Sequence, residues 1–437
     1  MQISIFKRKV FAVLFFAALI AGGFYFWRQH FAPSVVYKTA AEKNVYVRFD
    51  MEAYDDILQN YWKSATGSDM AQLFQLSLQK AGNFSAPPII ASPDRAGVAN
   101  MLLSVFKTAT SSEAEKNLAL NTLNVALYNL IPQGRDELLS SAQETTLRQT
   151  VANVNPSNDL YQNLGLQKGA GASEIDAAYK EKSAQLAGAT TTQAKAELAQ
   201  ISYAHEVLSN AADKQVYDQT QIEPTVWSRV IGDTLYLDMD KISPTTLAEF
   251  ARAVDAASTT PQLSDMILDL RGNIGGDLSF PQYFLGLFLG PNQYAFDLYH
   301  QGNYEAERTL EPKWPELDRY KEMAVLTDGM TQSTAELLTA TLKRFRIAVV
   351  VGGKTRGWGS VENTYPLQTV IDPNEKYSLL LVNGLTLGED NQPIEQNGVS
   401  PDIDTSDANW KEKLPDYFRS QSIIKAVEQI ATEKPLE

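Results

Sequence analysis

The clearest structural signal in the chain is the segment Leu268-Asp269-Leu270-Arg271-Gly272-Asn273-Ile274-Gly275-Gly276-Asp277. It continues an apolar run from Met266 to Leu270, which is typical of a strand covered on both faces. The glycines after the strand predict a tight turn, and their bare backbone can direct N–H groups at a developing negative charge. The segment therefore predicts a buried strand that leads into an anion-binding loop.

A second segment, residues 327–336, reads Thr-Asp-Gly-Met-Thr-Gln-Ser-Thr-Ala-Glu and follows the apolar run Ala324–Thr327. Ser333 opens an apolar helix at residues 337–342, so its hydroxyl is expected at the positive end of the helix dipole. This context favours a serine nucleophile. The alternative is a serine that only caps the helix, which is common at such positions.

Two later segments complete a pattern. Residues 350–361 read Val-Val-Gly-Gly-Lys-Thr-Arg-Gly-Trp-Gly-Ser-Val, and residues 393–403 read Pro-Ile-Glu-Gln-Asn-Gly-Val-Ser-Pro-Asp-Ile. In order and spacing, the four segments resemble the catalytic core of the C-terminal-processing (tail-specific) serine peptidases, over residues 225–405.

The resemblance implies an α/β core in which helices flank a central sheet, and it implies roles for individual residues. Ser333 would be the nucleophile. The backbone N–H groups of Gly275 or Gly276 and of Thr334 would form the oxyanion hole. A tight turn that simply requires glycine is the alternative explanation of the two glycines, and both explanations can hold at once.

The expected base is missing. The family places a lysine 25 residues after the serine, in a Gly-Lys-Gly turn, and a glutamine four residues later; this chain has Trp358 and Glu362 there. An indole has no lone pair that can accept a proton. The substitutes considered are Lys354, Glu362 as a buried carboxylate, and His300.

Two functions therefore stay open. The first is a membrane-anchored, extracytoplasmic serine endopeptidase that hydrolyses peptide bonds in protein substrates. The second is a pseudopeptidase that uses the same fold to bind peptides or to act as a scaffold, with Trp358 as a wall of the groove. In both, the partner is a polypeptide.

Composition excludes other classes. The net charge of −14 argues against a nucleic-acid partner. The chain has no cysteine, so disulfides and thiol catalysis are excluded. No cluster has metal-ligand spacing and no loop has a phosphate-binding pattern, so neither a metal nor an organic cofactor is expected.

The N-terminal sequence predicts a membrane anchor. Residues 1–9, which end in the basic cluster Lys7-Arg8-Lys9, are expected to be cytoplasmic. The uncharged residues 10–27 are expected to form a transmembrane helix. The bulk of the chain would then be extracytoplasmic in a single-pass protein of the cell membrane. A cleavable signal peptide is the alternative.

The rest of the chain is expected to be largely helical. Residues 45–150 show helical periodicity and resemble the N-terminal arm of the peptidase family, which is interpreted as a packing and dimerising bundle. Homo-oligomerisation is left open. Residues 406–437 are expected to form a C-terminal tail whose stretch 417–432 is an amphipathic surface helix.

Residues 156–220 resemble a J-domain, through segments such as Ile201-Ser-Tyr-Ala-His-Glu-Val-Leu-Ser209 and Lys214-Gln-Val-Tyr-Asp218. The His-Pro-Asp tripeptide of that family is absent, since Ala187-Gly188-Ala189 stands in its place. The segment is therefore interpreted as a small all-α module kept for its shape. A chaperone ATPase is not expected as a partner, and a J-type cochaperone is set aside.

Overall fold

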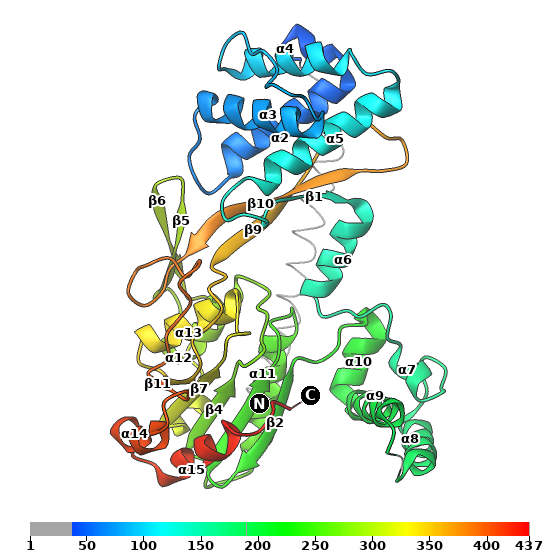
Figure 1. Ribbon diagram of the computed structural model, residues 1–437. Coiled ribbons are helices and arrows are strands. Elements are labelled where there is room, and N and C mark those ends of the chain that lie inside the picture. The colour runs from blue at the N-terminus through cyan, green and yellow to red at the C-terminus, as the bar shows by residue number, and fades with distance from the viewer. Residues whose placement is uncertain (1–36, 189, 437) are drawn as a thin grey trace. The chain divides into compact units, whose positions relative to one another are not determined.

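The computed structural model describes residues 37–188 and 190–436 (Figure 1). They form two compact units that are discontinuous in sequence. Of these residues, unit 1 contains 37–56, 65–129 and 367–374, and unit 2 contains 57–64, 130–188, 190–366 and 375–436. The apolar segment 10–27, expected to be a transmembrane helix, lies outside the described residues.

Unit 1 is a helical bundle. Its helical elements are η1 (Ala40–Lys43), most of α2 (Val45–Asn60), α3 (Gly67–Ala81), α4 (Arg95–Phe106) and α5 (Ser112–Tyr128). Its core is made by apolar residues at helical spacing that are fully buried, such as Phe49 and Phe74. Among the described residues, no helix has the length and the apolar composition that a membrane span requires.

The prediction of an all-helical region over residues 45–150 needs one correction. Residues 137–140 form the strand β1 (Glu137–Ser140), which pairs with β10 (Tyr377–Thr386). The partner strand lies some 240 residues away, and a four-residue strand has no periodicity that sequence reading could detect. The helical bundle ends at Asn129, and α6 (Ser141–Val151) belongs to unit 2.

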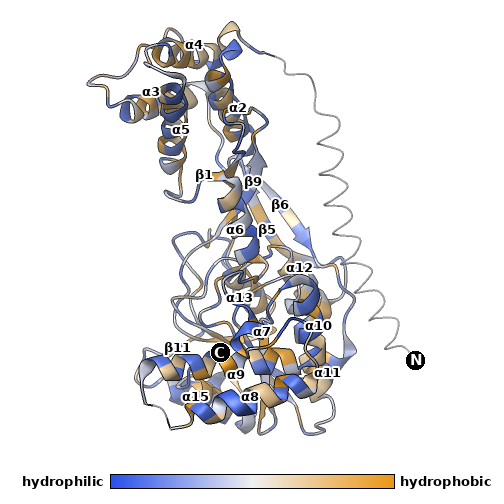
Figure 2. Cartoon of the chain, turned by 90° about the vertical axis from the view of Figure 1, so that its right-hand side faces the viewer, coloured by the Kyte–Doolittle hydropathy of each residue, from blue (hydrophilic) through white to orange (hydrophobic). Residues whose placement is uncertain are grey.

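The J-like segment forms a small helical module. It consists of α7 (Leu160–Asn163), α8 (Ala172–Leu186), α9 (Thr192–Ser209) and α10 (Ala211–Thr220), which share one apolar core. Figure 2 shows hydrophilic and hydrophobic residues alternating along α8, as expected for a helix buried on one side. A hydrogen bond from the Tyr203 hydroxyl to Glu223 ties α9 to the segment that leads into the next sheet.

The centre of unit 2 is a six-stranded sheet in the order β11-β8-β7-β4-β3-β2, parallel except for β2. Its strands are β2 (Val226–Ile231), β3 (Thr234–Met239), β4 (Asp265–Asp269), β7 (Glu322–Thr327), β8 (Val349–Gly352) and β11 (Ile403–Asp404). The apolar run that the sequence predicted as a buried strand is β4, whose residues are all buried.

Helices cover both faces of this sheet (Figure 1). One face packs against α11 (Thr246–Ala257), α12 (Phe280–Leu289) and α13 (Thr334–Arg344). The other packs against α14 (Trp410–Tyr417) and α15 (Gln421–Ile430). The α/β core is thereby confirmed. The amphipathic helix expected at residues 417–432 is present as α15, with the shorter range Gln421–Ile430, and a separate helix, α14, ends at Tyr417 before it.

A second sheet completes unit 2. Its order is β1-β10-β5-β6, and β9 pairs with β10 outside this path. The added strands are β5 (Tyr294–His300), β6 (Asn303–Arg308) and β9 (Ser360–Pro366), and the short helix η2 (Pro315–Arg319) precedes β7. This sheet is antiparallel throughout.

The parallel strands place the segments of interest together. The loop after β4 carries Gly275 and Gly276, and the turn after β7 carries Ser333. Since β4 and β7 are parallel neighbours, both loops lie at the carboxyl edge of the sheet.

Candidate active site

Ser333 occupies a strained backbone conformation just before α13. Its φ of 58° and ψ of −128° are values that residues with a side chain rarely adopt. Its side chain makes no capping hydrogen bond, and its backbone N–H donates to Glu336 Oε2 at 2.9 Å. The Ser333 hydroxyl is therefore not bonded to the helix end, while Glu336 supplies the capping-box contact to the Ser333 backbone.

The glycine loop after β4 packs directly against this serine. A side chain at Gly275 would bring its Cβ to 2.7 Å from Ser333 Cβ, and one at Gly276 would bring its Cβ to 1.7 Å from the carbonyl oxygen of Ile242. Both glycines also have positive φ, of 84° and 149°. Only glycine fits at these two positions, and the resulting close approach brings bare backbone against the serine.

The N–H groups of this loop are not equivalent. The N–H of Gly275 donates to Asn273 Oδ1 at 2.7 Å, so it stabilises the loop itself and is not directed at a ligand. Within the described chain, the N–H groups of Gly276 and Thr334 donate to no protein acceptor. The Thr334 hydroxyl donates to the carbonyl oxygen of Gly276 at 3.0 Å and holds loop and helix together. Of the two glycines offered as oxyanion donors, Gly275 is corrected to a loop-stabilising role.

Glu336 connects the serine to the turn that should carry the base. Its buried carboxylate accepts hydrogen bonds from the N–H groups of Ser333, Gly357 and Trp358, at 2.9, 2.7 and 2.7 Å, and from the Thr355 hydroxyl at 2.5 Å. Burial raises the pKa of Glu336, and the four donors oppose that rise. Two N–H groups on one carboxylate oxygen place the backbones of Ser333 and Trp358 side by side.

The indole of Trp358 is held on its face and on its edge. The guanidinium of Arg135 lies 3.2 Å above the ring centroid, and the indole N–H donates to Glu362 Oε1 at 3.3 Å. Arg135 also pairs with Glu395 at 3.2 Å, whose other oxygen accepts from the N–H groups of Gly359 and Ser360. The position of the family lysine is therefore occupied by a fixed aromatic side chain.

The three substitute bases differ in their surroundings. Burial raises the pKa of Glu362, but its Oε1 already accepts from the Ser360 hydroxyl at 2.6 Å and from the indole. Lys354 is exposed and so lacks the desolvation that a lysine base needs. His300 lies at the end of β5, and its Nδ1 is 2.6 Å from the carbonyl oxygen of Asn383.

Sequence reasoning missed two residues of this site. The position of Glu336, three residues after Ser333, was a signal, since Ser-x-x-Glu is the pattern of a capping box. Arg135 had no comparable signal, because nothing around it predicts contact with a residue more than 200 positions later. Both act on the loop that carries Trp358.

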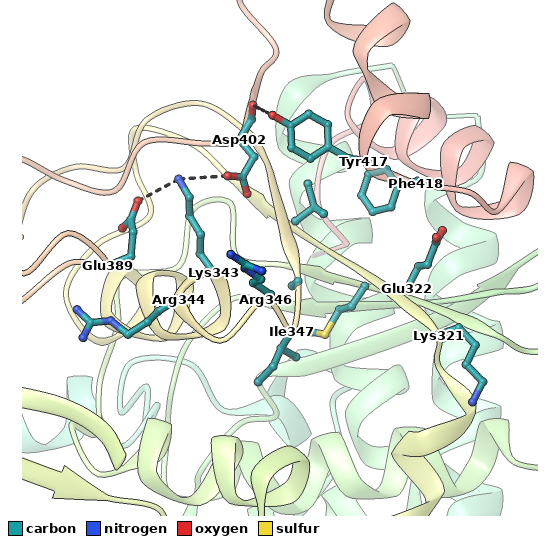
Figure 3. A pocket seen from close by; sticks show the side chains of 13 residues that line it. Lys321, Glu322, Lys343, Arg344, Arg346, Ile347, Glu389, Asp402, Tyr417 and Phe418 are labelled. Atoms are coloured by element: carbon teal, nitrogen blue, oxygen red, sulfur yellow. Dashed lines mark hydrogen bonds and ion pairs between the residues drawn. The ribbon is translucent and has the colours of Figure 1, made fainter. Parts of the chain in front are cut away.

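One pocket of the described chain lies away from this site. It has a volume of about 660 Å³ and is lined at the amino ends of β7 and β8 by residues that include Lys321, Glu322 and Ala348 (Figure 3). Lys343 spans it, with Glu389 at 3.0 Å and Asp402 at 3.3 Å. It is at the opposite edge of the sheet from Ser333 and contains none of the candidate residues.

Comparison with known proteins assigns families to two parts of the chain. Residues 233–405 match the model of peptidase family S41, and residues 159–218 match that of the DnaJ domain. A carboxy-terminal-processing protease of Bartonella bacilliformis is 27% identical over 198 residues, which are 45% of this chain and 43% of the relative. The carboxy-terminal processing protease CtpA of Bacillus subtilis is 26% identical over 197 residues, 45% of this chain and 38% of the relative.

The matched part is thus less than half the length of either curated relative. Among solved structures, a photosystem II D1 C-terminal processing protease has a TM-score of 0.47 at 11% identity, covering 82% of this chain and 92% of that chain. A lipoprotein from Streptococcus agalactiae has a TM-score of 0.43 at 13% identity, covering 88% of this chain and 98% of that chain.

The region that matches the S41 model begins at β3 and includes Gly276, Ser333 and Trp358. The chain therefore contains a C-terminal-processing peptidase core of family S41, preceded by a J-domain-like module.

Proposed function

We propose that the chain is a serine endopeptidase that hydrolyses peptide bonds in protein substrates, with Ser333 as nucleophile and the N–H groups of Gly276 and Thr334 as the oxyanion hole. The observation that carries this proposal is the strained Ser333 against a glycine loop whose side-chain-free backbone reaches it. Backbone strain of this kind persists only where the surrounding structure enforces it, and it is concentrated at active sites and ligand-binding sites.

The arrangement supplies two of the three parts that acyl transfer needs. The serine oxygen attacks the scissile carbonyl carbon, and the two N–H groups receive the negative charge that develops on the carbonyl oxygen. Glu336 acts as a positioning residue, because it fixes the backbone of Ser333 without touching the substrate. The third part is an acceptor for the serine proton.

Ser333→Ala tests the proposal. The purified full-length chain is expected to hydrolyse an unfolded protein substrate, and the variant is expected to fall to background because its nucleophile is gone. Thr331→Ser, a conservative change in the same turn, serves as a control for handling and expression. Equal background rates for wild type and Ser333→Ala would remove the peptidase proposal.

One observation favours the pseudopeptidase alternative. Trp358 fills the position of the family lysine and is fixed there by Arg135 and Glu362. A rigid aromatic surface beside an oxyanion loop suits the binding of an extended chain. Under this alternative, wild type and Ser333→Ala bind the same unfolded polypeptide with equal affinity and neither cleaves it.

The cellular setting is proposed from the sequence. The basic residues before the apolar segment 10–27 support a single-pass anchor with the bulk of the chain outside the cytoplasmic membrane. For the J-like module we propose a role in shape alone, because the position of the His-Pro-Asp tripeptide is taken by small residues. Its partner is then the peptidase core and not a chaperone ATPase.

A further inference from the structure

The surroundings of Ser333 include two exposed positive charges. Lys354 and Arg356, in the segment between β8 and Trp358, are both exposed to solvent. Among the residues that the structure describes, neither forms an ion pair with a carboxylate. Because the chain as a whole carries a net charge of −14, cations without an acidic partner beside the serine are candidates for contact with a ligand.

Direct contacts place the guanidinium of Arg356 next to the serine. Its Nη1 donates to Gln332 Oε1 at 2.6 Å, and Gln332 is the residue before Ser333. The guanidinium carbon lies 5.3 Å from the centroid of the Trp358 ring. The backbone N–H of Arg356 donates to the carbonyl oxygen of Thr331 at 3.0 Å. Both the side chain and the backbone of Arg356 are therefore bonded to the turn that ends in Ser333.

Most of the donors of this guanidinium are unused. A guanidinium has five N–H donors in a planar fork. Within the described chain, only the Nη1 of Arg356 donates to a protein acceptor, and that acceptor is the neutral amide of Gln332. The remaining donors can therefore bind the two oxygens of a carboxylate without breaking an ion pair.

The carboxylates on the neighbouring loops are bonded to other donors. Glu336 accepts from three backbone N–H groups and one hydroxyl. Glu362 accepts from the indole and from a serine hydroxyl, and Asp328 accepts from three backbone N–H groups of the two loops. Asp277, at the far end of the glycine loop, accepts from the N–H and hydroxyl of Ser279. An acid that pairs with the arginine must then come from a ligand.

Two apolar side chains are exposed on the loops that meet at Ser333. Ile274 lies in the glycine loop and is 40% exposed, and Met330 lies in the turn before Ser333 and is 54% exposed. The loops are joined because the N–H of Gln332 donates to the carbonyl oxygen of Asn273 at 2.9 Å. Apolar surface with a few polar groups beside it is typical of a binding site, and it suits a peptide in which an apolar residue lies close to an acidic one.

The position of the guanidinium limits where that acid lies along the peptide. An extended chain advances about 3.3 Å per residue. The guanidinium is bonded to the side chain of the residue before Ser333, so a carboxylate one to three residues from the scissile bond is within its reach.

We propose that Arg356 is a specificity-determining residue that binds a carboxylate of the polypeptide close to the bond that Ser333 attacks, an inference that rests on the proposed peptidase function. The side chain of an aspartate or glutamate supplies this carboxylate, or the α-carboxylate at the end of a chain does. The preferred polypeptide has an apolar residue and this carboxylate within a few residues of each other.

The structural alternative is that Arg356 only ties the segment before Trp358 to the serine turn through Gln332. In that case Arg356→Gln lowers the cleavage of acidic and neutral peptides by the same factor. If Arg356 binds a carboxylate, the same change also removes the preference for the acidic peptide. The ratio of the two rates is therefore the readout that separates the two roles.

The probes are acetylated, internally quenched peptides with one leucine in an alanine background and an amidated C-terminus. One residue, placed one to three positions from the leucine on either side, is Asp, Asn or Lys. A further pair of peptides keeps Asn and ends one to three residues after the leucine, in a free carboxylate or in an amide. The Asp and free-carboxylate peptides distinguish an acidic side chain from a chain end.

For the full-length wild type, we expect kcat/KM to be about ten-fold higher for the best carboxylate peptide than for its neutral counterpart. Arg356→Gln should bring this ratio to about one, and Arg356→Glu should favour the Lys peptide over the Asn peptide. The matched controls are the same two changes at Arg346, an exposed arginine at the opposite edge of the sheet, which should keep the wild-type ratio. Thermal unfolding checks that the variants are folded, and Arg356→Gln alone decides if Arg356→Glu does not fold.

Binding separates the failure of this inference from the failure of the peptidase function. Fluorescence anisotropy of the same peptides, singly labelled, on full-length Ser333→Ala measures the preference without cleavage. If the wild type cleaves no peptide but Ser333→Ala binds the carboxylate peptide about ten-fold more tightly, the peptidase function is overturned and the carboxylate site stands. Equal or absent binding of the carboxylate and neutral peptides, or a preference that Arg356→Gln keeps, overturns the inference even where Ser333-dependent cleavage is found.

Discussion

At the scale of single residues, the loop that carries Trp358 is held by three carboxylates, two of them buried and the third half-buried. Glu336 accepts hydrogen bonds from the backbone N–H groups of Gly357 and Trp358, and Glu395 accepts them from those of Gly359 and Ser360. Glu362 accepts a hydrogen bond from the indole N–H of Trp358. Each carboxylate is satisfied by hydrogen bonds, which is how buried acids are tolerated. The loop is therefore held rigidly by hydrogen bonds, with Trp358 where the resemblance places a lysine.

This rigidity predicts how a base could be restored at residue 358. A lysine there would meet Glu362 Oε1, which now accepts from the indole at 3.3 Å, and an ion pair with that carboxylate would keep the lysine protonated. Glutamine removes the charge and leaves an acceptor. We expect Trp358→Lys with Glu362→Gln to give Ser333-dependent hydrolysis about ten-fold or more above that of Trp358→Lys alone.

Steady-state hydrolysis of the unfolded substrate measures this recovery. Glu362→Gln without the lysine is the matched control and should stay at the level of the wild type. The prediction is wrong if Trp358→Lys alone recovers as much activity as the double change.

At the scale of elements, the sequence predicted most where the pattern is local. The strand β4, the glycine turn and the serine at the start of α13 all follow from apolar runs, glycines and cap residues that are adjacent in sequence. Arg135 could not be predicted in the same way. Its environment is created by pairing between distant strands, as when β1 joins β10, and no short segment of sequence encodes such a pairing.

The helix α2 contains two aspartates with opposite effects on stability. Asp50 is fully buried, and its two carboxylate oxygens have no hydrogen-bond partner among the described residues. Burial raises its pKa well above the ordinary value of 3.8, so the folded chain holds this proton when the unfolded chain has lost it. Asp55 accepts two hydrogen bonds from Arg95, at 2.7 and 2.8 Å, and its pKa is lowered.

The effect of each aspartate on the pH dependence of stability follows from the difference between its pKa in the folded and in the unfolded chain. The contribution of Asp50 to the free energy of unfolding is greatest below pH 3.8. It falls as the pH rises, because only the unfolded state releases the proton, and it becomes constant above the pKa of Asp50 in the folded state. Asp50→Asn keeps a neutral side chain, so at neutral pH it should raise the free energy of unfolding by about 1.4 kcal/mol for each unit between the unfolded pKa and the lower of the folded pKa and the pH, and Tm should rise with it. Asp55→Asn, in the same helix, should lower Tm because it breaks the contact with Arg95.

Thermal unfolding of the full-length chain across the pH range measures both effects. The two variants should shift Tm in opposite directions at neutral pH. A lower Tm in Asp50→Asn would show that the buried carboxylate has a partner in solution.

At the scale of the whole molecule, the proposed anchor gives a topology that can be measured. In intact spheroplasts, added trypsin should degrade residues after the apolar segment 10–27 and spare a cytoplasmic marker, because the basic cluster before that segment favours the inner side. Carbonate washing should leave the chain in the membrane. Release of the chain with a new N-terminus near the small residues 21–23 would favour the cleaved signal peptide.

The loop between β9 and β10 has a practical consequence for anyone who divides the protein. Residues 367–374 belong to the helical unit although both flanking strands belong to the peptidase unit. Within that unit, Glu52 accepts from the N–H of Thr369 at 2.9 Å and Lys116 contacts Asp372 at 3.0 Å, while Leu367 and Ile371 are buried. A fragment that begins after residue 129 would expose the side chains of Leu367 and Ile371 to solvent, and these would promote aggregation. A soluble fragment of the peptidase unit therefore also requires the removal of residues 367–374 between β9 and β10.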